Sequence, residues 1–77
     1  MMTLTKKEIR KAIQQYIPVG VEMPHTTAVK TWLLENVFDY DAWIRDDYCA
    51  IVVKALEKEG FFSSFRSATG TKIYVRN

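Results

Sequence analysis

The sequence predicts a small domain of the α+β class, mainly α-helical, with a β-hairpin at its C-terminal end. Apolar residues recur at helical spacing in three segments before Gly60. After Gly60 this spacing is lost, and aromatic and β-branched residues dominate, as is typical of strands. The chain has 77 residues, 48% of them hydrophobic, which suffices for one core and argues against disorder. We therefore expect a single domain over residues 1–77.

A first helix is expected over residues 5–17. Thr5 and Glu8 have the spacing of a capping box, in which each side chain accepts a hydrogen bond from the backbone N–H of the other. Pro18 ends the helix because proline cannot continue the hydrogen-bond ladder. The predicted buried stripe is Ile9, Ala12, Ile13, Tyr16 and Ile17. The basic residues of the opposite face are interpreted as solvent-exposed.

A second helix is expected over residues 26–37, after a connecting loop at 18–25. His25, Thr26 and Thr27 are the candidates for its N-terminal cap, because their side chains can accept hydrogen bonds from free N–H groups of the first turn. The predicted apolar stripe of this helix is Val29, Trp32, Leu33 and Val37.

A third helix is expected over residues 41–59. Asp39 or Asp41 would cap its start, and Gly60 would end it in a left-handed conformation. The predicted buried stripe is Ile44, Tyr48, Ile51, Val52, Ala55 and Leu56.

A β-hairpin is expected over residues 61–76, with a short turn in which Gly70 supplies a positive φ angle. An isolated hairpin is only marginally stable in water, so this one is expected to pack on the helices. The residues predicted to make that contact are Phe61, Phe65, Ile73 and Val75.

Three helices followed by a hairpin resemble the winged helix-turn-helix superfamily of DNA-binding domains. The resemblance is strongest over 54–62, which is similar to the end of a recognition helix, and over 70–76, which is similar to a wing. It implies a winged-helix fold and a small prokaryotic or phage transcriptional regulator that binds double-stranded DNA. It also implies that the third helix faces the major groove and that the wing contacts an adjacent phosphate strand.

The resemblance assigns DNA contacts to particular positions of this chain. The implied contacts are Thr26, Thr27 and Lys30 on the second helix, Trp43 and Arg45 at the start of the third, and Arg66, Thr71, Lys72 and Arg76 in the wing. The wing carries three cations and no acid, which favours phosphate binding. These cations could instead protect the edge of the hairpin from pairing with another chain.

The acidic residues of the middle segment count against reading of the major groove. The predicted start of the third helix carries Asp39, Asp41, Asp46 and Asp47 around Arg45, and several carboxylates near DNA phosphates are costly. A structural explanation is equally available, because the helix dipole favours acids at this end. The sequence does not separate DNA from RNA as the ligand.

A protein-interaction module of the same fold is the alternative function. Trp43, Ala50 and Val53 lie on the predicted outer face of the third helix and would form a contact with a partner or a second copy. Equally, Trp43 could cap the core or stack on Tyr40. A protein-interaction module of this kind keeps the winged-helix fold but no longer reads the major groove.

Catalytic chemistry is not expected. His25 is the only histidine and is interpreted as a capping or surface residue, and Cys49 is the only cysteine, next to acids that disfavour its thiolate. The sequence has no cysteine–histidine cluster for a metal and no glycine-rich phosphate loop. We expect no enzyme activity, cofactor or small-molecule substrate. With no apolar run of membrane-spanning or signal-peptide length, a cytoplasmic location is expected.

Overall fold

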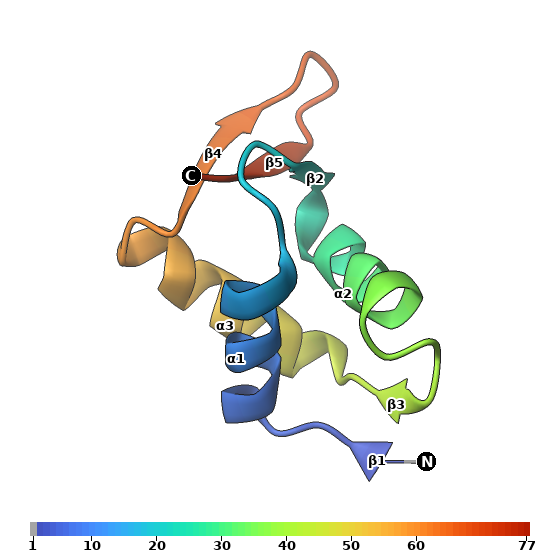
Figure 1. Cartoon of the computed structure of the whole chain (residues 1–77). Helices are drawn as coiled ribbons and strands as arrows, with labels where there is room; N and C mark the ends of the chain where they lie inside the picture. The colour runs from blue at the N-terminus through green and yellow to red at the C-terminus, as the bar shows by residue number, and fades with distance from the viewer. Residues whose placement is uncertain (1) are drawn as a thin grey trace.

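The computed structural model describes residues 2–77, and within this range it contains three helices and five short strands (Figure 1). In chain order they are β1 (Met2–Thr3), α1 (Lys6–Tyr16), β2 (Glu22–Pro24), α2 (His25–Asn36), β3 (Ala42–Trp43), α3 (Asp46–Lys58), β4 (Phe62–Arg66) and β5 (Lys72–Arg76). The predicted α+β class, with three helices before a C-terminal hairpin, is confirmed. No helix in the described part of the chain has the length and apolar character needed to cross a bilayer.

A three-stranded antiparallel sheet forms one end of the molecule, with strand order β2-β5-β4 (Figure 1). Tyr74 of the central strand β5 lies opposite both Met23 of β2 and Ser64 of β4. The prediction that 18–25 is only a loop was therefore wrong. Met23 is buried between two exposed neighbours, so this short segment has the alternation of an edge strand.

A second, parallel pair joins β1 to β3 at the opposite end of the molecule (Figure 1). The N–H of Leu4 donates to the carbonyl of Trp43 over 2.9 Å and extends this pairing. Because residues 42–43 are extended, α3 begins at Asp46 and not near 41, and its N-cap is Arg45 without a side-chain cap bond. The predicted caps Asp39 and Asp41 are therefore wrong.

The start of α1 matches its sequence pattern. The N–H of Glu8 donates to Thr5 Oγ1 over 3.1 Å, and the N–H of Thr5 donates to Glu8 Oε1 over 3.0 Å. The bond from the Thr5 backbone holds the pKa of the Glu8 carboxyl below its ordinary value. A capping box depends on residues three positions apart, so it was predictable without the rest of the fold.

The core is centred on α3, which packs against α1, α2 and β4. Its buried residues are Cys49, Val52, Val53 and Leu56. The predicted stripe was partly wrong, since Ile51 is 52% exposed and Val53, placed on the outer face, is fully buried. Ile44 is buried but lies before the helix, so a helical spacing that starts from Ile44 predicts a rotated face.

The hairpin packs on the helices through the face opposite to the predicted one. Phe62 and Tyr74 are 1% and 2% exposed, whereas Phe65 is 48% exposed. Successive strand residues point to opposite sides of a sheet, so an error of one position exchanges the buried and exposed sets. Of the four residues predicted to make this contact, Phe61 alone packs against the core, and it precedes β4. Gly70 has φ +86°, as predicted for the turn.

Candidate nucleic-acid interface

A hollow of about 430 Å³ lies where α2, α3 and the hairpin meet. It is lined by His25 and Thr26 from the start of α2, Ala50 and Lys54 from α3, and Arg66, Lys72 and Tyr74 from the hairpin. Three of these seven residues are lysine or arginine and none is acidic. The hollow is therefore a basic concavity built from elements far apart in the sequence.

Strand register places the two hairpin cations on one face. Arg66 and Lys72 are direct cross-strand partners, so their side chains lie on the same side of the sheet. Tyr74 is two residues after Lys72 and shares this side, which faces the helices. Arg66 also donates from Nη1 to the carbonyl of Gly70 over 2.9 Å, which ties it to the turn. The predicted wing residues Arg66 and Lys72 are thus brought together.

Lys72 is partly neutralised by a carboxylate from α3. Its Nζ lies 3.0 Å from Oε1 of Glu57 and 5.2 Å from the centroid of the Tyr74 ring. The hydroxyl of Ser64 donates to the other oxygen of Glu57. This hydrogen bond first, and Lys72 second, hold the pKa of Glu57 below its ordinary value, and Glu57 in turn raises the pKa of Lys72.

Lys54 and Arg66 have no carboxylate partner among residues 2–77. Both are exposed. Their charges are therefore available to a bound anion at no cost in broken ion pairs.

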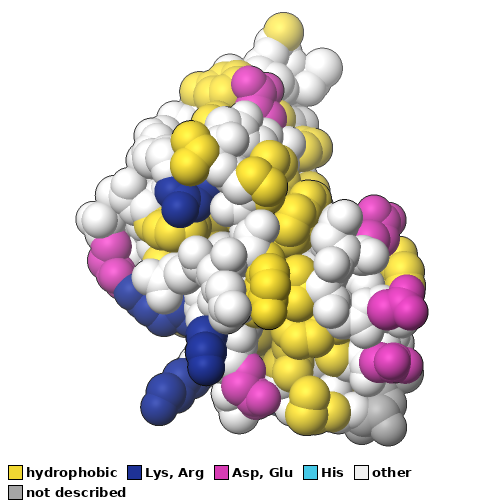
Figure 2. Space-filling view, viewed as in Figure 1, with side chains coloured by type: hydrophobic (Ala, Val, Ile, Leu, Met, Phe, Trp, Pro, Cys, Tyr) yellow, Lys and Arg dark blue, Asp and Glu magenta, His cyan; other side chains and the backbone are white. Residues whose placement is uncertain are grey.

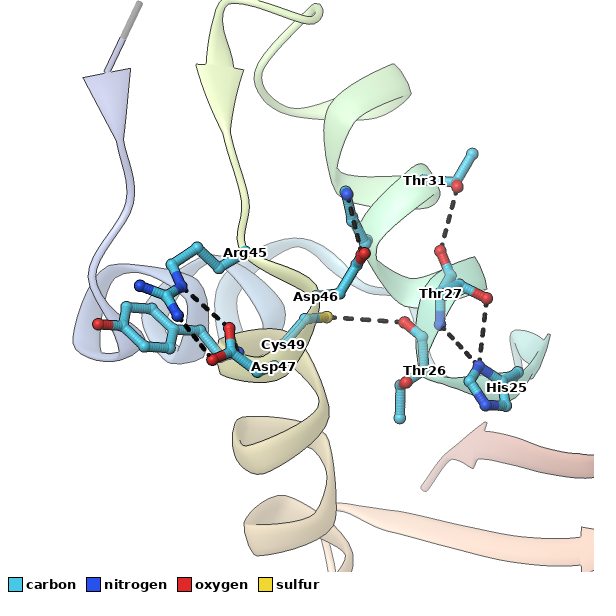
Figure 3. A network of polar contacts seen from close by, with 10 residues as sticks. His25, Thr26, Thr27, Thr31, Arg45, Asp46, Asp47 and Cys49 are labelled. Carbon is cyan, nitrogen blue, oxygen red and sulfur yellow. Dashed lines mark hydrogen bonds and ion pairs between the residues drawn. The ribbon is translucent and has the colours of Figure 1, made fainter.

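The first turn of α2 forms one wall of the hollow. Figure 3 shows the side chains of His25, Thr26 and Thr27 in this turn. His25 has φ +66°, and its Nδ1 accepts a hydrogen bond from the N–H of Thr27 over 3.3 Å. His25 therefore acts as a cap, as was predicted for it, while Pro24 at the formal N-cap makes no side-chain bond. Thr26 is 7% exposed and lines the hollow, whereas Thr27 is exposed outside it.

The residues around the start of α3 form a separate cluster (Figure 3). Arg45 donates from Nε and Nη2 to the two carboxylate oxygens of Asp47, at 3.0 and 2.9 Å. Lys30 Nζ lies 2.9 Å from Asp46 Oδ1 and 5.0 Å from the ring centroid of Trp43. None of these five residues lines the hollow.

These ion pairs weaken the repulsion of DNA that the sequence predicts for the acids around the start of α3. The hydrogen bonds between Arg45 and Asp47 raise the pKa of the guanidinium and lower that of the carboxyl. Asp46 is matched by Lys30. Two of the four acids expected to repel DNA are therefore compensated, and the other two lie in the turn before β3 and not on α3.

Two predicted wing contacts lie outside the hollow. The guanidinium of Arg76 stacks 3.9 Å from the ring centroid of Phe61 and donates to the carbonyl of Asn77, at the end of β5 away from the hairpin turn. Thr71 donates its N–H to Ser67 Oγ over 3.2 Å and stabilises the turn. Both residues contribute to the structure of the hairpin.

The predicted protein interface is not a continuous surface. Val53 is fully buried, Ala50 is half-buried and lines the hollow, and Trp43 lies on β3, 51% exposed. Cys49, on the same buried face of α3 as Val53, donates its thiol to the Thr26 carbonyl over 3.6 Å. Burial raises the pKa of this thiol to about 11.

Sequence analysis missed two members of the hollow, Lys54 and Tyr74, and did not connect His25 with it. Lys54 was noted only within the motif at the end of the third helix, although it lies one turn after Ala50 on an exposed face. His25 was interpreted only as a capping or surface residue. Neither Lys54 nor His25 could be connected with the hairpin from sequence, because the packing of β4 and β5 against α3 creates the hollow.

Comparisons with protein-family models, curated proteins and solved structures found no match to this chain. Among residues 2–77 there is no cluster of metal-binding side chains.

Proposed function

We propose that this chain is a small winged-helix DNA-binding protein that acts as a transcriptional regulator and holds a phosphate strand of the duplex in the basic hollow. The observation that carries this proposal is the convergence of Lys54, Arg66 and Lys72 on one concavity beside the first turn of α2. Cations from two separate elements bind successive phosphates better than the same charges scattered over the surface.

The topology supports the winged-helix part of the proposal. Strand β2 lies between α1 and α2 in the chain and pairs with the last strand, so helices and hairpin form one unit. This arrangement is compatible with a helix-turn-helix formed by α2 and α3 and a wing formed by β4 and β5. The hollow lies where these two parts meet.

The electrostatics support binding that depends mainly on the phosphate backbone. Each lysine or arginine that neutralises a phosphate releases condensed counterions, and the logarithm of the binding constant then falls with the logarithm of salt concentration by about 0.9 per contact. Three cations, one of them shared with Glu57, predict a slope of about −2 to −3. Arg45 is occupied by Asp47, so we propose no base contact for it.

A salt titration tests the proposal. Fluorescence anisotropy with a labelled duplex of about 20 base pairs, roughly two helical turns, should show binding at low salt that weakens with the slope given above. The same titration with double-stranded and single-stranded RNA of matched sequence shows whether the ligand is DNA. Absence of binding at low salt, or affinity independent of salt, would contradict the proposal.

A further inference from the structure

A second concavity lies between α1 and the end of α2, and six of its nine lining residues are apolar. It encloses about 390 Å³, and its apolar lining comprises Met2, Leu4, Ala12, Tyr16, Val37 and Phe38. We call it the α1–α2 groove. It shares no lining residue with the basic hollow.

Large apolar side chains remain uncovered along this groove. Met2 is 55% and Tyr16 49% exposed, and Phe38 is only half-buried. The two helices pack mainly against α3 and much less against each other, which leaves the groove open between them. Figure 2 shows the resulting strip of apolar side chains running along this face of the molecule. A contiguous apolar strip with polar margins is typical of an interaction surface.

The two margins of the strip differ in net charge, which is positive on the α1 side and negative on the α2 side. In Figure 2 the basic side chains lie on one side of the strip only, whereas acidic side chains lie on both sides. On the α1 side, Lys7, Glu8 and Lys11 are exposed, and Glu8 and Lys11 line the groove. The carboxylate of Glu8 accepts the N–H of Thr5 in the capping box. On the α2 side, Glu35 and Asp41 are exposed on the segment that contains Val37 and Phe38. No ion pair within residues 2–77 involves Lys7, Lys11, Glu35 or Asp41.

We propose that the α1–α2 groove binds a second copy of this chain in a two-fold symmetric dimer, with the axis running along the groove. Rotation by 180° about such an axis brings the basic margin of each copy opposite the acidic margin of the other. The apolar strips then meet each other. A surface with an apolar centre and oppositely charged margins is self-complementary under this operation, as an isologous interface requires.

This dimer would leave both basic hollows open, because the groove and the hollow are separate surfaces. The proposal therefore does not depend on DNA binding. Since each face of so small a domain is limited in area, we expect a reversible dimer whose population depends on concentration.

Charge reversal on either margin tests the proposal. One variant carries Lys7→Glu and Lys11→Glu, and the other carries Glu35→Lys and Asp41→Lys. In each variant alone both margins have the same sign, so sedimentation equilibrium should show dimerisation weakened at least about tenfold. In an equimolar mixture of the two variants, each margin of one variant faces a margin of opposite charge on the other. A dimer that contains one copy of each variant should therefore form. Asp39 is left unchanged because its φ of +49° disfavours lysine.

A control variant with Lys6→Glu and Lys58→Glu has the same change in net charge as the first variant but lies outside both the groove and the basic hollow. It should dimerise like the wild type, and circular dichroism should show that all variants are folded. The proposal would be overturned if the wild type stayed monomeric up to a concentration of about 1 mM. An interface with a dissociation constant above this value is too weak to be specific. Failure of the mixture to restore the dimer would overturn the proposal as well.

Discussion

The basic hollow and the start of α3 contain similar side chains in opposite electrostatic states. At the start of α3, Lys30 and Arg45 are each paired with an aspartate of the first helical turn. In the hollow, only Lys72 has a carboxylate partner, while Lys54 and Arg66 have none within residues 2–77. The number of cations is therefore a poor guide to a polyanion site. What matters is how many of them are left uncompensated after folding.

The cause of the difference lies in the secondary structure. The dipole of a helix favours acidic side chains at its N-terminus, and α3 carries Asp46 and Asp47 there. The nearby cations Lys30 and Arg45 therefore form ion pairs with these two carboxylates. A hairpin has only a small net dipole, and β4 and β5 contain no acidic residue. A carboxylate that neutralises a cation of the hairpin must therefore come from another element. Helix α3 supplies one such carboxylate, that of Glu57, which pairs with Lys72.

Removal of the two uncompensated cations should have the largest effect. A variant with Lys54→Ala and Arg66→Ala should bind duplex DNA at low salt about tenfold or more weakly, and its salt slope should be shallower by about 2. Anisotropy titrations at several salt concentrations measure both quantities. The matched control is Lys6→Ala with Lys58→Ala, which removes the same charge outside both the hollow and the α1–α2 groove. Equal losses in the two variants would show that net charge alone attracts DNA.

Removal of the compensating acid should have an intermediate and opposite effect. Glu57→Gln leaves Lys72 free, so we expect DNA affinity to rise about two- to threefold and the salt slope to become steeper by up to about 1. An unchanged slope would mean that Lys72 does not contact phosphate.

The same variant tests the pH dependence of stability. The pKa of Glu57 is lowered from its ordinary value of 4.5, so its interactions stabilise the folded state fully above that pH. This stabilisation is lost as the pH falls from about 4.5 through the lower folded-state pKa. Thermal unfolding between pH 7 and 3 should therefore show a smaller acid-induced loss for Glu57→Gln than for the wild type. The difference should be at most about 1 kcal/mol, because the pair is partly exposed.

Neutralisation of a compensated pair should have the smallest effect. A variant with Arg45→Gln and Asp47→Asn removes one positive and one negative charge together, and it should change DNA affinity by less than about twofold. Unfolding in urea should show little change in stability, as for other exposed ion pairs. A large loss of affinity would show that Arg45 leaves Asp47 to contact DNA.

Sequence patterns were reliable where they depended on neighbours within one turn. The capping box at Thr5, the end of α1 near Pro18 and the turn at Gly70 all follow from local geometry, and all were predicted. They were unreliable where a distant segment decided the backbone conformation. Pairing with β1 makes residues 42–43 extended, and this moved the start of α3 by five residues from the predicted position.

The candidate site shows the same division. That Arg66 and Lys72 belong to one hairpin was predictable, because their spacing and the turn between them are local properties. Which face of the hairpin they occupy was not, since the predicted inward set contained Phe65 in place of Phe62. Aromatic residues occur on both faces of β4, so the sequence pattern alone leaves both orientations open.

By itself, the sequence determined three helices, a C-terminal hairpin and a stretch rich in cations but free of acids at that end. Hydrogen bonds and hydrophobic spacing over short distances carry this information. Only the tertiary structure decided which cations were neutralised, which side of the hairpin faced the helices and which surfaces stayed open. These properties arise from contacts between segments tens of residues apart, such as Lys72 with Glu57 and Arg66 beside the start of α2.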